Sequence, residues 1–103
     1  MTELRPIHLA VLDKRRPVLV LTRPWAVAEL NAVVVAPIGT RARGLRTEVA
    51  VGPANGLDHD SVITVDSTSR VLRENLGPVI GFLLAGQEAQ LTAALVAAFD
   101  LQV

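Results

Sequence analysis

Cysteine is absent from this sequence of 103 residues, and aromatic side chains make up 3% of it. Without cysteine there can be no disulfide, no thiolate metal site and no cysteine nucleophile. The two histidines, His8 and His59, are too few for a convincing metal cluster, so we expect no metal and no other cofactor. The scarcity of aromatic rings also excludes recognition of nucleic acid mainly by base stacking.

Long apolar runs are missing as well. A membrane-spanning helix needs about 18 or more consecutive apolar residues, and no such run exists in this sequence. The N-terminus carries charges on both sides of a short apolar stretch, which is not the pattern of a signal peptide. We therefore expect a cytoplasmic protein without a membrane contact. Half of the residues are hydrophobic, so residues 1–103 are expected to form one domain with one modest core.

The net charge of zero conceals a strong asymmetry along the chain. Residues 1–46 hold eight Lys and Arg against three acids, a net charge of +5, and residues 47–103 carry the opposite −5. Such segregation favours a folded molecule with one basic face, suited to a polyanion, and one acidic face. The alternative is that the arginines are spread over a solvated surface.

The first half of the chain has the pattern of a β-hairpin, a short helix and a buried strand. Residues 7–13 and 16–23 are apolar runs rich in Val, Ile and Leu around a charged turn, which predicts the hairpin. Pro24 suits the first position of a short helix. Residues 32–38 lack alternation, which predicts a strand buried on both faces. Pro37 indicates that pairing stops there or that the strand lies at an edge.

The second half predicts further strands and a terminal helix. Strands are expected over residues 45–51, 61–67 and 79–84, separated by segments rich in Gly, Pro, Asn and Asp. Residues 87–101 predict the best helix, with a buried face of Leu91, Leu95, Ala98 and Phe99. Short strands at small spacings with two helices describe a mainly β (α+β) fold, a small and strongly bent antiparallel barrel.

Several short motifs resemble the MazF/PemK family of toxin endoribonucleases, and their order covers nearly the whole chain. The N-terminal segment is most similar to a mycobacterial-type branch of that family. The matching motifs are RPVLVLT at 16–22, VAPIGT at 35–40, GL at 56–57, DSVITVD at 60–66, LG at 76–77 and the closing FDL.

The resemblance implies a homodimer of SH3-like barrels that cleaves single-stranded RNA without a metal. A cognate MazE-type antitoxin would silence it by laying a disordered tail across the active face. The implied reaction is attack of a ribose 2′-hydroxyl on the adjacent phosphate, which leaves a 2′,3′-cyclic phosphate and a 5′-hydroxyl. Such a reaction requires stabilisation of phosphorane-like charge, a proton acceptor and a proton donor.

The resemblance also implies three catalytic positions. Arg16 matches the arginine of the family's Arg-Pro motif, and a guanidinium can hold two phosphate oxygens at once. The family places a Thr or Ser two residues after the strand-end proline, where this sequence has Gly39. Thr40 is one residue late, so either Thr40 supplies the hydroxyl or the hydroxyl is absent. Asp66 matches a base used in another branch, with His59 or Asp60 as alternatives.

Six further residues are expected to contact RNA. The basic ones would position phosphate or form a rim that also suits an acidic antitoxin tail. A solvated loop is the alternative for the arginines after the PIGT motif, and a turn cap is the alternative for the serine. The expected RNA-binding residues are Lys14, Arg15, Arg41, Arg43, Arg46 and Ser61.

The leading hypothesis is a sequence-specific, metal-independent endoribonuclease toxin. Because Gly39 occupies the hydroxyl position, the alternative is a non-catalytic or attenuated barrel that binds RNA or antitoxin. A gyrase-poisoning toxin on the same barrel is disfavoured, because the closing FDLQV lacks the terminal tryptophan expected for that contact.

Overall fold

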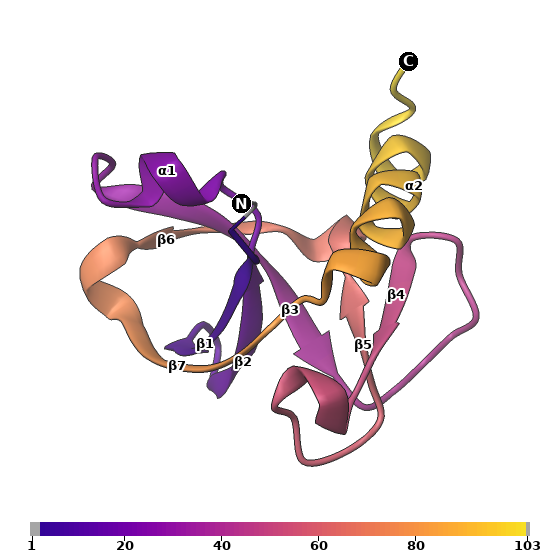
Figure 1. Cartoon of the computed structure of the whole chain (residues 1–103), viewed down its shortest axis with the longest axis horizontal. Helices are drawn as coiled ribbons and strands as arrows, with labels where there is room; N and C mark the ends of the chain where they lie inside the picture. Colours follow the sequence, from indigo (N-terminus) through magenta and orange to yellow (C-terminus); the bar gives the residue numbers. More distant parts are fainter. Residues whose placement is uncertain (1–2, 103) are drawn as a thin grey trace.

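The computed structural model of the chain describes residues 3–102. In this range a seven-stranded antiparallel sheet is combined with two α-helices and four short 3₁₀ turns, η1 to η4 (Figure 1). The strands are β1 Pro6–Val11, β2 Arg15–Val20, β3 Ala32–Gly39, β4 Glu48–Val51, β5 Ser61–Thr64, β6 Ser69–Leu72 and β7 Leu76–Phe82. The helices are α1 Pro24–Val27 and α2 Glu88–Phe99, and the turns are η1 Pro53–Asn55, η2 Val65–Ser67, η3 Arg73–Asn75 and η4 Ala85–Gln87.

The predicted hairpin is confirmed and forms the middle of the sheet. β1 and β2 pair antiparallel, with Ile7 opposite Leu19 and Val11 opposite Arg15 at the tip. β7, the last strand, pairs with the free edge of β1. The full strand order is β4-β5-β3-β2-β1-β7, with β6 also paired to β3.

β3 is a central strand that has two partners on one edge. Its first half pairs with β6 as far as Val35, and its end pairs with β5 from Ile38 onward. Pro37, which has no N–H to donate, lies between these two ladders and still stands opposite Val18 of β2. The pairing with β2 stops at Pro37, as one alternative predicted, but the strand continues to pair with β5, and the edge-strand alternative is wrong. The prediction of burial on both faces fails at Val34, which is 44% exposed.

The two ends of the strand order, β4 and β7, are joined by side-chain contacts. Within residues 3–102 no backbone ladder links these two strands. Asn55, in the turn after β4, accepts a hydrogen bond from Gly52 N at 3.1 Å and donates to Phe82 O at 2.9 Å and to Gln87 Oε1 at 2.7 Å. Its side chain is 2% exposed, and the bonds satisfy its buried amide. This contact completes the bent, barrel-like shape.

The terminal helix α2 packs on β4 and η2, as Figure 1 shows, and α1 lies at the far end of the sheet. Leu91 and Ala94 are buried against the strands, and the predicted helix is confirmed. The predicted burial of Phe99 is wrong, since this ring is 53% exposed. The last turn of the helix extends past the sheet, and the helix is capped after Phe99 by Asp100, whose φ of 52° is left-handed. Neither described helix is long and apolar enough to cross a membrane.

Several strand boundaries differ from the predictions. β4 begins at Glu48 rather than at residue 45, because the preceding residues form a turn held by the Glu48 carboxylate. The strand expected over 61–67 ends at Thr64, where the chain enters η2. β6 was not predicted, and β7 begins at Leu76, one residue before the Gly77 and Pro78 that were expected to mark the start of a strand centred on residues 79–84.

Candidate active site

A cavity of about 290 Å³ lies where the end of β3, the following loop and η2 face the start of β2. We call it the Arg16 cavity. It combines three arginines from the basic half of the chain, residues 1–46, with two carboxylates from the acidic half, residues 47–103. The cavity is therefore not a purely basic face. Its lining residues are Arg16, Pro37, Gly39, Arg41, Arg43, Leu45, Glu48, Thr64, Asp66 and Ser67.

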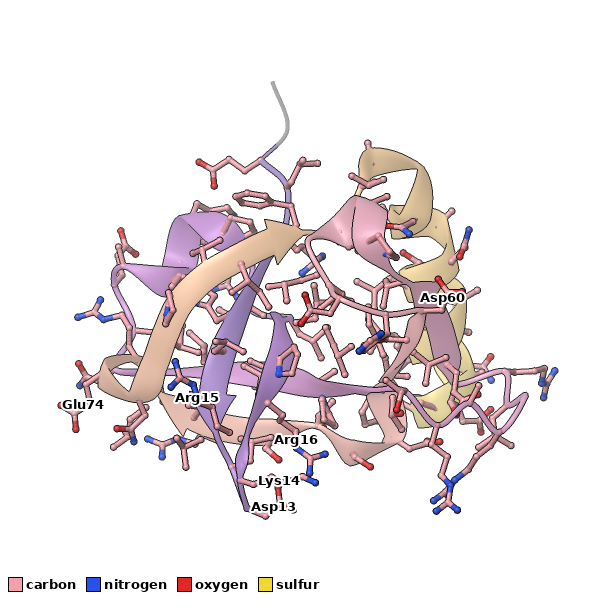
Figure 2. The ribbon with its side chains drawn as sticks, turned by 90° about the horizontal axis from the view of Figure 1, so that it is seen from below. Asp13, Lys14, Arg15, Arg16, Asp60 and Glu74 are labelled. Atoms are coloured by element: carbon pink, nitrogen blue, oxygen red, sulfur yellow. The ribbon has the colours of Figure 1, made fainter. Side chains whose placement is uncertain are left out.

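Arg16 enters this cavity because of its place in the β1–β2 hairpin. Successive residues of a strand point to opposite faces, so Arg15 points away while Arg16 points inward (Figure 2). The Arg16 Nη2 atom lies 3.1 Å from one carboxylate oxygen of Asp13 and donates a hydrogen bond to the other at 3.2 Å. Its side chain is 27% exposed, and its Nε–H has no acceptor within the described chain. The guanidinium is oriented and keeps unused donor capacity.

Asp66 reaches the same cavity from η2. Its Oδ2 atom accepts a hydrogen bond from Thr47 Oγ1 at 2.5 Å, while the neighbouring Val65 N donates to Thr47 O at 3.1 Å. These two bonds fix the turn to the segment before β4 and orient the carboxylate. The Oδ1 atom has no hydrogen-bond donor among residues 3–102, so it is available as a proton acceptor.

Glu48 is a residue of the cavity that sequence reasoning missed. Its carboxylate accepts hydrogen bonds from the backbone N–H groups of Arg43 and Leu45, all at 3.1 Å. These bonds hold the loop of residues 41–46, here called the arginine loop, against the start of β4. The sequence shows only that Glu48 is a single acid after a segment with three arginines. That pattern does not predict that its carboxylate binds the backbone N–H groups of this segment.

Replacing Glu48 by alanine is expected to loosen the arginine loop. We expect the amide exchange rates of Arg43 and Leu45 to rise about tenfold or more, because their N–H groups lose the acceptor. Hydrogen exchange measured by NMR tests this, with Glu29→Ala as the control because Glu29 is exposed at the end of α1. Unchanged exchange at both amides would contradict the assigned role of Glu48.

The segment after β3 separates two cavities. Gly39, Arg41 and Arg43 line the Arg16 cavity, whereas Thr40 and Ala42 line a second cavity of about 560 Å³. Alternate residues of this segment therefore line the two cavities. Thr40 is thus not among the residues that line the cavity of Arg16.

A hydroxyl in the Arg16 cavity has other sources. Thr64 and Ser67 both line that cavity, and sequence reasoning did not assign either to the site. A Cβ built on Gly39 would meet no atom within 4 Å, so a larger side chain fits there without displacing its neighbours. The missing hydroxyl at position 39 is therefore not a consequence of crowding.

The remaining candidates are distributed elsewhere. Lys14, Arg15 and Arg46 are exposed and line neither cavity. Asp60 and Ser61 line the second cavity, where the Ser61 hydroxyl donates to the backbone carbonyl of residue 59 at 2.9 Å, as a turn cap would. Within residues 3–102, no three His, Asp or Glu side chains gather in a way that could hold a metal ion. The candidates that meet in the Arg16 cavity are Arg16, Arg41, Arg43 and Asp66.

The fold and this cavity define a class of protein. Residues 3–99 match the family model described as the PemK-like, MazF-like toxin of type II toxin-antitoxin systems, and the chain belongs to this family.

Individual relatives are close in sequence or structure. The chain is 52% identical over 98 residues, 95% of each chain, to Endoribonuclease MazF3 of Mycobacterium tuberculosis. The structure of the Mycobacterium tuberculosis toxin MazF-mt6 superimposes with a TM-score of 0.94 at 52% identity, covering 96% of this chain and 100% of that one. A mycobacterial endoribonuclease in complex with its cognate antitoxin shares the fold, with a TM-score of 0.87 at 22% identity and 99% of each chain covered.

Proposed function

We propose that this protein is an endoribonuclease toxin that cleaves single-stranded RNA at the Arg16 cavity. The meeting of Arg16 and Asp66 in one cavity, on a chain of the MazF-like family, is the observation that carries the proposal. The relative at 52% identity is named an endoribonuclease, which supports the same activity here. A cognate MazE-type antitoxin and a homodimer are the partners that the family membership supports.

The proposed reaction needs three groups around the scissile phosphate. The ribose 2′-oxygen forms a bond to phosphorus while the bond from phosphorus to the 5′-oxygen breaks, which leaves a cyclic phosphate. Asp66 accepts the 2′-hydroxyl proton, and the departing 5′-oxygen takes a proton from solvent. Arg16 stabilises the negative charge that builds on the phosphate oxygens, since a guanidinium remains charged at any working pH.

The arginine loop extends the positive surface beyond the reacting phosphate. Arg41 and Arg43 line the Arg16 cavity, where they can hold phosphates that flank the cut. Lys14, Arg15 and Arg46 lie outside it and would act on more distant phosphates or on an acidic antitoxin tail. Sequence specificity would then come from polar contacts to bases.

The activity is tested with purified protein and a mixed single-stranded RNA in EDTA. We expect cleavage that leaves 2′,3′-cyclic phosphate and 5′-hydroxyl ends, because the proposed charge stabilisation comes from arginine. RNA binding without such ends would overturn the proposal. Cleavage that requires added Mg²⁺ would overturn its metal-independent part.

A second candidate is an attenuated or non-catalytic barrel, and Gly39 favours it. If the site lacks a hydroxyl there, Gly39→Thr is expected to raise the single-turnover cleavage rate about tenfold, the effect of one charge-assisted hydrogen bond. A Cβ at this position would meet no atom within 4 Å, so the substitution starts without a clash. Thr40→Val is the matched control and should change the rate little, because Thr40 faces the other cavity. A large loss in Thr40→Val would instead place the Thr40 hydroxyl at the reaction.

A further inference from the structure

The second cavity, here called the Asp60 cavity, has a composition different from that of the Arg16 cavity. Most of its wall is made of small or apolar residues, and no arginine or lysine lines it. Its polar side chains are few and stand around that wall. They belong to Thr40, Asn55, Asp60, Ser61 and Gln87.

The Asp60 carboxylate is the strongest acceptor in this cavity. It makes no hydrogen bond or ion pair within residues 3–102. A Cβ built on Gly52 would lie 3.0 Å from Asp60 Oδ1, so the carboxylate rests against the glycine backbone. Gln87 Nε2 is weakly engaged, with its two acceptors, Ala50 O and Asn55 Oδ1, both 3.4 Å away. Asp60 is an exposed residue at the edge of this cavity, so acceptor and donor capacity remains unused around a mostly apolar wall.

The two cavities share one wall, a single extended segment. Residues 39, 41 and 43 line the Arg16 cavity, and residues 40 and 42 line the Asp60 cavity. An RNA strand whose phosphate lies among the arginines can therefore turn a neighbouring base across this wall.

We propose that the Asp60 cavity is a base-recognition subsite that takes an unstacked guanine next to the cut. The inference rests on the proposed RNA cleavage at the Arg16 cavity. Two carboxylate oxygens match two adjacent N–H donors, and guanine presents such a pair, N1–H and N2–H, on its Watson–Crick edge. Adenine and cytosine place one amino donor beside an acceptor nitrogen, and uracil places its N3–H between two carbonyl oxygens.

The antitoxin is a less suitable occupant of this cavity. The tail expected to silence the toxin is acidic, and the unpaired carboxylate of Asp60 would repel it. An RNA phosphate would be repelled as well, whereas the edge of a base would not. A carboxylate beside an RNA path is therefore best explained by contact with a base.

Binding of uncleavable DNA hexamers tests the inference without relying on cleavage. Each hexamer carries one guanine in an otherwise uniform thymine strand, and inosine, which lacks the 2-amino group, replaces it in a paired hexamer. For the wild-type protein we expect the inosine hexamer to bind about tenfold more weakly at one position. In Asp60→Asn this difference should disappear, because an amide offers one acceptor and one donor.

Glu74→Gln is the matched control. Glu74 is an exposed acid that Figure 2 shows on the opposite side of the molecule from Asp60, and the variant should keep the full guanine preference. Equal binding of guanine and inosine hexamers by the wild type would overturn the inference. An Asp60→Asn variant that keeps the preference, or that changes only antitoxin affinity, would overturn it too.

Mapping of cut sites in a random RNA library separates this inference from the proposed function. A wild-type protein that cuts RNA with no guanine at any fixed position would overturn the subsite and leave the activity intact. A guanine preference in hexamer binding without any cleavage would support the subsite and overturn the proposed function.

Discussion

Arg16→Ala is expected to slow single-turnover RNA cleavage by a factor of about a hundred to a thousand, the cost of one preorganised donor to transition-state charge. The alanine removes the guanidinium from a cavity in which Asp13 holds it in place. The chain should still fold, because Arg16 stands near the exposed tip of the hairpin and its neighbours Val18 and Leu19 supply the buried packing. Cleavage is measured at saturating enzyme, so that weaker RNA binding does not hide the chemical step.

Arg15→Ala is the control for Arg16. It removes the same charge from the next residue on the opposite face of β2, and it should change RNA affinity modestly while leaving the cleavage rate of the bound RNA intact (Figure 2). An equal loss of cleavage rate in both variants would mean that the rate depends on the total positive charge of the hairpin and not on the position of Arg16. A large fall in the melting temperature of Arg16→Ala would instead mean that Arg16 stabilises the fold.

Gly81→Ala is expected to destabilise the protein by about 3 kcal/mol or more, at the upper end of what single substitutions do. A Cβ on Gly81 would lie 1.7 Å from the backbone oxygen of Asn55 and 2.6 Å from its carbonyl carbon. Backbone atoms cannot rotate away as a side chain can, so β7 would have to move off the turn that follows β4. Urea unfolding followed by circular dichroism measures the change.

Gly86→Ala is the matched control, because a Cβ there would meet no atom within 4 Å. Its unfolding free energy should stay within about 0.5 kcal/mol of the wild type, as for most surface substitutions. If Gly81→Ala were as stable as Gly86→Ala, the close approach of β7 to Asn55 would not hold in solution.

The fold was largely predictable from local patterns. The hairpin, the strand of residues 32–38 and the terminal helix each carry a clear run of β-branched residues or a helical period, and the structure confirms them. β6 was missed because Ser69–Leu72 has only two apolar residues and is recruited by pairing with β3, a contact far away in sequence. Phe99 was misjudged because helical spacing does not reveal where the sheet beneath the helix ends.

The candidate site was less predictable than the fold. The Arg-Pro motif predicted Arg16, and its entry into a cavity with Asp66 agrees with that expectation, while its catalytic role stays a prediction. Glu48 was missed because its role lies in backbone contacts, which have no composition signal. Thr40 lines the Asp60 cavity because alternate residues of the segment 39–43 line the two cavities. The Gly and Arg content of this segment did not indicate that alternation. Distances across a barrel follow only from the complete fold.

The pairing of β1 with β7 has a consequence for protein synthesis. The first strand of the chain acquires its second neighbour only when residues 76–82 have left the ribosome. Until then β1 has an open edge, and Asn55 has no Phe82 carbonyl to bind. The residues that line the Arg16 cavity all precede β7, so they are synthesised before this edge of β1 is covered. The β1 edge therefore stays open to pairing with other chains until almost the whole chain has been synthesised.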